Sequence, residues 1–267
     1  MTHLLDDSHD RRFGGLDRLY GEGSRLALHR ARIAVVGVGG VGSWAVEALA
    51  RSGVGNLTLI DFDHVAVSNV NRQIQALSST LGEAKVGALE TRIRDINPDC
   101  RVTPVDDFLT VENMTQLIAP GAFDAVIDAC DEAKVKAALI VHGRFNKIPL
   151  VVCGAAGGKR DPLKLRCDDL GRTTQDALLA RIRNMLRKDY NIQPKKNGKF
   201  GAACVYLEEP SMRSTSCSAS DLSCSGYGSS VTVTAAMGFA AASWCLERIV
   251  ASQTNDNLST KNTNDTK

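Results

Sequence analysis

Short apolar runs alternate with amphipathic segments over residues 30–155 of the chain. The runs are rich in branched aliphatic side chains and predict strands at 33–36, 57–60, 101–105, 125–128 and 150–153. Apolar residues at helical spacing predict helices between them, at about 41–52, 85–97, 111–118 and 133–146. This alternation implies an α/β fold with a Rossmann-like, doubly wound and mainly parallel sheet, covered by helices on both faces.

The pattern changes after residue 161. Residues 162–230 mix short strand-like pieces, a basic helix and Ser/Gly-rich loops, and an apolar stretch at 231–245 predicts a terminal helix. We therefore divide the chain into a nucleotide-binding core (10–155), a C-terminal extension packed on the same domain (156–252) and a disordered polar tail (253–267).

Both ends of the chain carry further predictions. Residues before Asp10 are polar and predicted to be mobile, whereas Leu19, Leu26 and Leu28 that follow predict one amphipathic helix. The apolar stretch near the C-terminus is short for a bilayer span and contains hydroxyl side chains. It predicts a buried core helix and no stable membrane insertion.

Composition narrows the class of protein. The 267 residues carry a formal net charge of +2, so a nucleic-acid-binding surface has to be a local patch. The N-terminal residues lack a signal-peptide-like apolar run, which favours the cytoplasm. None of the eight cysteines forms a C-x-x-C pair, so the sequence predicts no zinc site, and reduced thiols rather than disulfides.

A nucleotide-binding motif follows the first predicted strand. Gly37, Gly39 and Gly42 give the spacing G-x-G-x-x-G at the start of a helix, where backbone N–H groups can approach a phosphate closely. Asp61 ends the second strand, placed to accept hydrogen bonds from a ribose. The motif alone is weak evidence, because dehydrogenases use it for nicotinamide cofactors.

Three charged residues favour ATP over a dinucleotide. Arg72, in the polar loop 61–74, can grip a terminal phosphate with its guanidinium, and Lys85 opens the next helix with a point charge suited to an α- or β-phosphate. Asp131, after the fourth strand, can hold a phosphate-bound Mg²⁺. The rival, a nicotinamide dehydrogenase, predicts NADH binding and no need for Arg72 or Lys85.

Five motifs occur in an order that resembles the ubiquitin-activating-enzyme-like superfamily, which includes the ThiF and MoeB adenylyltransferases. They are G-V-G-G-V-G-S, L-I-D-F-D, S-N-V-N-R-Q, E-A-K and D-A-C-D, within residues 12–155. The resemblance implies adenylation of a carboxylate. It also implies that the nucleotide is held by Gly37, Gly39, Gly40 and Gly42, with Asp61 on the ribose, Asp63 beside it, Asn69 and Arg72 on the phosphates, Lys85 on the transferring phosphorus and Asp131 on magnesium.

A narrower resemblance involves the flanks. R-F-G-G-L-D-R-L-Y-G, G-A-A-G-G-K-R-D-P and C-S-G-Y-G-S-S are similar to the tRNA threonylcarbamoyladenosine dehydratase branch (TcdA/CsdL) of that superfamily. This branch implies ATP-dependent cyclisation of threonylcarbamoyladenosine beside the anticodon, and the superfamily implies a homodimer. Two alternatives stay open: an adenylyltransferase acting on the C-terminus of a ubiquitin-like or sulfur-carrier protein, and a non-catalytic nucleotide-sensing partner protein.

Two features leave roles open. ThiF and MoeB enzymes begin R-Y-x-R-Q and lend the second arginine to the neighbouring subunit's ATP, but Gly15 occupies that place, so Arg12 and Arg18 are both candidates. Cys224, flanked by glycine-rich sequence, either supports the structure or a monovalent-cation site (Na⁺ or K⁺), or takes part in sulfur transfer or covalent catalysis. The sulfur reading would make a cysteine desulfurase or sulfur-acceptor system a partner.

A basic stretch is the candidate tRNA surface, because phosphate contacts of lysine and arginine give sequence-independent, salt-sensitive binding. The alternative is that these residues form a solvated helix and loop that bind no nucleic acid. Only one acid, Asp189, interrupts the seven basic residues, which are Arg181, Arg183, Arg187, Lys188, Lys195, Lys196 and Lys199.

Overall fold

The computed structural model describes residues 7–212 and 227–264, and side chains within residues 8–212 and 227–253. A seven-stranded sheet with the order β3-β2-β1-β4-β5-β7-β6 forms its centre. All neighbouring strands are parallel except β6, which is antiparallel to β7. The predicted Rossmann-like α/β fold is therefore confirmed. The strands are β1 (Arg32–Val36), β2 (Asn56–Ile60), β3 (Arg101–Val105), β4 (Ala125–Asp128), β5 (Leu150–Cys153), β6 (Leu165–Asp169) and β7 (Ala203–Leu207).

The central strands are apolar on both faces because helices cover both. In β1, Ile33 and Val35 join one hydrophobic cluster, whereas Ala34 and Val36 join the cluster on the opposite face. This two-sided burial explains why the strand is a continuous apolar run rather than an alternating one.

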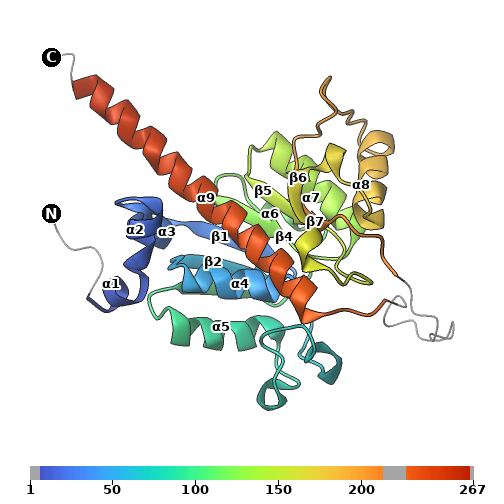
Figure 1. The fold of residues 1–267 in the computed structure, drawn as a ribbon, viewed down its shortest axis with the longest axis horizontal. Helices are drawn as coiled ribbons and strands as arrows, with labels where there is room; N and C mark the ends of the chain where they lie inside the picture. The colour runs from blue at the N-terminus through green and yellow to red at the C-terminus, as the bar shows by residue number, and fades with distance from the viewer. Residues whose placement is uncertain (1–6, 213–226, 265–267) are drawn as a thin grey trace.

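Two layers of helices sandwich the sheet (Figure 1). One layer contains α4 (Gly42–Arg51), α5 (Lys85–Ile96) and α9 (Val231–Asn264), and the other contains α6 (Met114–Leu117), α7 (Ala133–Phe145) and α8 (Ala177–Lys188). At Gly238 of α9, a Cβ atom would lie 2.5 Å from the carbonyl oxygen of Val41, so α9 approaches α4 as closely as backbone allows. Short 3₁₀ turns lie at Val67–Asn69, Ser78–Thr80, Pro162–Lys164 and Leu170–Arg172.

The N-terminal region differs from the sequence prediction. Three short helices, α1 (Asp7–Phe13), α2 (Gly15–Tyr20) and α3 (Ser24–Arg30), replace the single amphipathic helix, and α1 begins before Asp10. Gly21 and Gly23 adopt φ angles of 100° and 86°, which end one helix and begin the next. Leu19, a predicted apolar-face residue, is 72% exposed.

The C-terminal helix confirms one prediction and departs from another. Met237, Ala241 and Cys245 are completely buried in the core, as expected of a core helix. The stretch Val231–Gln253 is long and apolar enough for a membrane span by composition, but half of its most apolar window is buried inside the protein. The helix runs on to Asn264, where the sequence predicts a disordered tail from residue 253. Extending a packed helix is easier than nucleating one, which accounts for the polar continuation.

Candidate active site

The carboxyl ends of β1, β2 and β4 meet at one edge of the sheet, where the strand order reverses. Open α/β sheets bind ligands in the crevice at this position. Gly37 leaves β1 with φ +78°, and a Cβ atom there would lie 2.8 Å from the backbone nitrogen of Cys130 in the turn after β4. A Cβ atom on Gly42 would lie only 1.8 Å from the carbonyl oxygen of Gly37. The glycine loop is thus pressed against the β4 turn, and no larger residue fits at either position.

Asp61 joins the glycine loop to the acidic loop. Asp61 is 8% exposed, and its Oδ2 accepts a hydrogen bond from the Val38 N–H at 2.8 Å. Oδ1 accepts from the Asp63 N–H at 2.9 Å. Each carboxylate oxygen has a second acceptor direction, so the group can still receive ribose hydroxyls. These backbone contacts fix the orientation of the carboxylate.

Lys85 begins α5, as predicted, and is almost completely buried. Its Nζ lies 2.7 Å from Oδ2 of Asp63, and its backbone N–H donates to the carbonyl oxygen of Asp63 at 3.0 Å. The structure thus brings these two predicted residues together at the nucleotide edge.

Arg72 lies along the glycine loop. A Cβ atom on Gly40 would be 3.4 Å from Cγ and Cδ of Arg72. The guanidinium donates to the carbonyl oxygen of Ser68 at 2.7 Å and to Oδ1 of Asn71 at 2.9 Å. The indole N–H of Trp44 donates to the Arg72 carbonyl oxygen at 2.9 Å. This arrangement holds a cation next to the position where a phosphate would enter.

Asn69 and the start of α9 order the same loop. The buried Asn69 accepts the Ala66 N–H at 3.0 Å through Oδ1, which closes the turn that precedes Arg72. The Asn71 side chain donates to the carbonyl oxygen of Ser229 at 3.1 Å, just before α9. The C-terminal extension therefore reaches the nucleotide edge.

Asp131 has an exposed side chain in the turn after β4, and a completely buried ion pair lies below it. Nζ of Lys136 lies 3.0 Å from Oδ1 of Asp128 and donates to the Asp128 carbonyl oxygen at 3.1 Å. Burial opposes the charged form of Lys136, but the carboxylate of Asp128 outweighs it and raises the Lys136 pKa. Burial, reinforced by the same carboxylate, raises the pKa of Cys130 well above its ordinary value, so this thiol stays protonated at neutral pH.

Several residues at this edge were not predicted. The sequence contains no motif that assigns Trp44 to this site. The only general expectation is that an indole N–H needs a hydrogen-bond partner. Gln75, 2% exposed, donates to the carbonyl oxygen of Val38 at 2.9 Å and supports the glycine loop. Phe62 and Phe108 follow β2 and β3, are both about half exposed, and touch with ring centroids 5.2 Å apart. The sequence signal that could have pointed to this aromatic pair is Phe62, an apolar residue placed between Asp61 and Asp63.

The candidate replacement arginines do not reach this edge within one chain. Arg12 donates to the carbonyl oxygen of Ile96 at 3.1 Å, at the C-terminal end of α5 and thus at the opposite edge of the sheet. There it lines an open cavity of about 470 Å³ with Arg51 and Arg92. Arg18 is exposed on α2. Cys224 lies outside the described residues.

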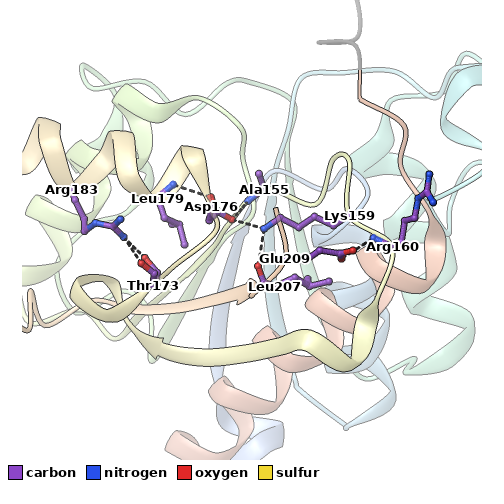
Figure 2. Close-up of polar contacts among 9 residues, drawn as sticks. All are labelled: Ala155, Lys159, Arg160, Thr173, Asp176, Leu179, Arg183, Leu207 and Glu209. Atoms are coloured by element: carbon purple, nitrogen blue, oxygen red, sulfur yellow. Dashed lines mark hydrogen bonds and ion pairs between the residues drawn. The ribbon is translucent and has the colours of Figure 1, made fainter. Parts of the chain in front are cut away.

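The basic stretch divides into structural and exposed residues. Arg183 donates to the carbonyl oxygen of Thr173 at 3.0 Å and to its hydroxyl (Figure 2). It also donates to the carbonyl oxygen of Leu170 at 3.1 Å, so it fastens α8 rather than offering a free phosphate contact. Arg187 lies over the ring of Phe200, 5.3 Å from its centroid. Exposed side chains remain at Arg181, Arg187, Lys188, Lys195 and Lys196, with Lys199 half-buried.

Comparison with known proteins agrees with this geometry. The model of the ThiF family matches residues 11–266. The tRNA threonylcarbamoyladenosine dehydratase of Escherichia coli K12 is 45% identical over 263 residues, covering 94% of this chain and 98% of the relative. The dehydratase of Haemophilus influenzae is 43% identical, covering 91% and 95%. The molybdopterin-synthase adenylyltransferase of E. coli is 41% identical over 130 residues, covering only 49% of this chain.

Solved structures give the same result. The structure of E. coli tRNA N6-threonylcarbamoyladenosine dehydratase, TcdA, in complex with ATP has a TM-score of 0.87 and 45% identity, and covers 94% of this chain and 99% of that chain. The complex of the same enzyme with AMP has a TM-score of 0.88, with 95% and 100% covered. The chain belongs to the ThiF family.

Proposed function

We propose that this chain is an ATP-dependent tRNA threonylcarbamoyladenosine dehydratase, which activates the threonine carboxylate by adenylation. The extent of the likeness carries this proposal. It spans nearly all of both chains for the dehydratases, including the C-terminal extension, and about half of this chain for the adenylyltransferase that acts on a protein. The missing C-x-x-C pairs point the same way.

The residues at the nucleotide edge take the roles that their geometry permits. The glycine loop of Gly37, Gly39, Gly40 and Gly42 receives the phosphates, and Asp61 accepts the ribose hydroxyls through the free acceptor directions of its carboxylate. Phe62 and Phe108, exposed beside Asp61, offer a face on which the adenine can stack. Asn69 keeps the turn before Arg72 in shape.

The threonine carboxylate attacks the α-phosphorus of ATP, so that a phosphorus–oxygen bond forms and pyrophosphate leaves. Arg72 and Lys85 stabilise the negative charge that grows on the phosphoryl oxygens, and Asp63 orients Lys85. The carbamoyl group then attacks the activated carbonyl, which closes the ring, breaks the bond to AMP and releases one proton to solvent. Ring closure is intramolecular, so proximity supplies much of the rate without an enzyme nucleophile.

Magnesium fits this site. Mg²⁺ is usually held by one or two carboxylates together with substrate phosphates and water, and the exposed Asp131 supplies such a carboxylate. When bound, the ion neutralises phosphate charge. Among the described residues no group of three or more His, Cys, Asp or Glu side chains is arranged to hold a metal.

The substrate is tRNA, and its binding surface includes the exposed basic side chains of α8 and the loop that follows it. Arg181 and Lys188 on α8, with Lys195 and Lys196 after it, provide phosphate contacts. A homodimer, an arginine supplied from Arg12 or Arg18 of a second copy, a cytoplasmic location, a Na⁺ or K⁺ site, and a desulfurase or sulfur-acceptor partner stay predictions, as do the role of Cys224 and the domain boundaries.

The decisive experiment incubates the protein with ATP, Mg²⁺ and tRNA that carries threonylcarbamoyladenosine, followed by mass spectrometry of the nucleoside under mild handling. We expect loss of one water that requires ATP and that Asp131→Ala abolishes. Asp99→Ala, which removes an exposed carboxylate at the opposite edge of the sheet, is the matched control and should keep activity. An unchanged nucleoside, with pyrophosphate exchange only after a carrier protein is added, would replace this proposal with protein adenylation.

A further inference from the structure

The loop of residues 154–161, here called the β5 loop, lies at the same edge of the sheet as the nucleotide-binding turns. It follows β5, which is parallel to β4 and next to it. Its backbone is held at its start and near its middle: the Gly154 N–H donates to the carbonyl oxygen of Val205, and the Gly158 N–H to that of Gly228, both at 2.8 Å. The β5 loop is therefore a fixed surface beside the reaction site.

A completely buried ion pair fastens the middle of this loop. Nζ of Lys159 lies 3.0 Å from Oδ2 of Asp176 and 3.0 Å from the carbonyl oxygen of Leu207 (Figure 2). The same Oδ2 accepts the Ala155 N–H at 2.9 Å, and Oδ1 accepts the Leu179 N–H at 3.0 Å in the first turn of α8. The pair thus joins the β5 loop, β7 and the basic helix α8.

This pair supplies position more than stability. Apolar residues of similar size often replace a buried ion pair without loss of stability, because desolvation offsets the attraction. A Cβ atom on Gly154 would lie 2.4 Å from Oδ2 of Asp176, so the carboxylate is seated directly against the loop backbone. Lys159 and Asp176 therefore set where the next residue of the loop stands.

That next residue is Arg160. Its backbone N–H, and that of Asp161, both donate to Oε2 of Glu209 at 3.0 Å. The Arg160 side chain is exposed and points away from the buried pair (Figure 2). Over the described residues, no hydrogen bond or ion pair reaches its guanidinium.

Three neighbouring basic residues, Lys164, Arg166 and Arg172, differ from Arg160 in that their side chains form ion pairs with acids. Each lies within 4 Å of a carboxylate: 3.8 Å for Lys164 and Asp161, 3.4 Å for Arg166 and Glu208, and 3.8 Å for Arg172 and Asp168. Arg160 is thus a cation with an available guanidinium on a rigid backbone, at the edge where an anionic substrate must arrive.

We propose that Arg160 binds a backbone phosphate of the tRNA, and that Lys159 and Asp176 are positioning residues that hold Arg160 in place. A guanidinium presents a planar fork to phosphate oxygens, and a fixed backbone limits the entropy lost on binding. This inference rests on the proposed activity on tRNA, and it adds a contact outside the α8 stretch.

Arg160→Gln tests the contact. We expect the Kd for tRNA to rise about 3- to 10-fold, and the slope of log K against log salt to shrink by about one. The kcat at saturating tRNA and the KM for ATP should not change. Arg101→Gln, which removes an exposed arginine at the start of β3 and thus at the opposite edge, should bind tRNA like the wild type.

Comparison of tRNA with and without the threonylcarbamoyl group identifies the anion. A phosphate contact predicts the same loss for both tRNAs. A loss confined to the modified tRNA would assign Arg160 to the threonine carboxylate instead and overturn the phosphate assignment, and an unchanged Kd for both would overturn the contact itself. The wild type must first dehydrate its tRNA, because failure there counts against the proposed function and not against Arg160.

A double-mutant cycle tests the positioning. The neutral pair Lys159→Met with Asp176→Asn should raise the tRNA Kd like Arg160→Gln, and adding Arg160→Gln should raise it no further, since coupled residues are not additive. Lys159→Gln keeps a donor in the pocket and should have a smaller effect. If the effects of the neutral pair and of Arg160→Gln on the tRNA Kd multiplied, the positioning role would be refuted. An unchanged Kd in either folded Lys159 variant would also refute it.

Discussion

Two buried lysine–aspartate pairs lie at the same edge of the sheet and have the same ion-pair distance, 3.0 Å between Nζ and a carboxylate oxygen. Lys136 and Asp128 lie under the nucleotide-binding turn, on consecutive elements β4 and α7. Lys159 and Asp176 join the β5 loop to α8, on the side that we propose binds tRNA. All four side chains are completely shielded from solvent.

The pairs differ in how completely their carboxylates are satisfied. Both oxygens of Asp176 accept backbone N–H groups in addition to the lysine. Asp128 engages Lys136 and Cys130 through Oδ1 only, and its Oδ2, buried among the described residues, accepts no hydrogen bond from them. The Asp176 carboxylate is therefore stabilised by backbone donors on both oxygens as well as by its lysine. The Asp128 carboxylate relies mainly on Lys136 to compensate its buried charge.

The largest expected effect is on the nucleotide side. Lys136→Met leaves the Asp128 carboxylate buried without a counter-charge, and we expect the free energy of unfolding to fall by about 3–5 kcal/mol. Adding Asp128→Asn, which removes the orphaned charge, should recover most of that loss. Chemical denaturation measures both values. Lys134→Met, an exposed lysine on the same helix, is the control and should change stability little; a similar loss there would contradict the comparison.

The second-largest expected effect is on catalysis, where a substitution in the nucleotide region should change kcat but not the affinity for tRNA. Arg72→Ala removes a cation that is held beside the glycine loop, and we expect kcat to fall by about 10²–10³-fold. The Kd for tRNA should stay within about two-fold, because the role proposed for Arg72 is to bind the phosphates of ATP. Arg101→Ala, at the opposite edge, should keep full kcat. If Arg72→Ala lowered the affinity for tRNA and left kcat unchanged, Arg72 would belong to the tRNA-binding surface and not to the nucleotide site.

The nucleotide-binding edge was far more predictable from sequence than the proposed tRNA-binding region. Gly37, Asp61 and Lys85 fall within one continuous run of strand, loop and helix, so local spacing determines how they meet. The parallel direction of the core strands also follows from the local alternation of strands and helices.

The remaining features depend on contacts distant in sequence. Lys136 and Lys159 resemble surface lysines in their local sequence, and only the fold buries them. Arg183 belongs to a basic run, yet its guanidinium is taken by Thr173 on the preceding turn. No local pattern predicts that Asn71 meets Ser229, which is 158 residues away.

Lys159→Met tests the explanation directly. Asp176 keeps the N–H groups of Ala155 and Leu179 when the lysine is lost, so we expect a smaller loss of about 2–3 kcal/mol in the free energy of unfolding. The comparison with Lys136→Met under identical denaturation conditions is the measurement. Equal losses in the two variants would show that the backbone donors do not account for the difference between the pairs.

The three lysines in the loop after α8 should contribute to tRNA binding only through their charge. Neutralising Lys195, Lys196 and Lys199 to glutamine should raise the Kd for tRNA by on the order of 10-fold at low salt, and reduce the salt slope by about two. ATP binding and kcat at saturating tRNA should not change. Lys134→Gln with Lys147→Gln, exposed lysines on and after α7, serves as the control. Unchanged tRNA binding at low salt would remove this loop from the tRNA surface.

The smallest expected effect concerns a third ion-pair cluster, which is only partly buried and lies away from both regions. Burial opposes the ionised form of Glu47, but hydrogen bonds from Arg92 and Arg51 outweigh it and hold the Glu47 pKa below its ordinary value. A carboxyl group with a lowered folded-state pKa stabilises the protein above its unfolded-state pKa, and loses that contribution as the pH falls through the folded-state value.

Glu47→Gln should therefore lower the free energy of unfolding by about 1 kcal/mol at neutral pH, a modest value because both arginines are partly exposed. The difference from the wild type should shrink as the pH falls through the acidic range toward about pH 3. Glu83→Gln, an exposed glutamate, should show neither effect. A Glu47→Gln deficit that persists unchanged at acidic pH would mean that packing of the side chain, rather than its charge, supports this cluster, and the contrast with the two buried pairs would then concern shape and not electrostatics.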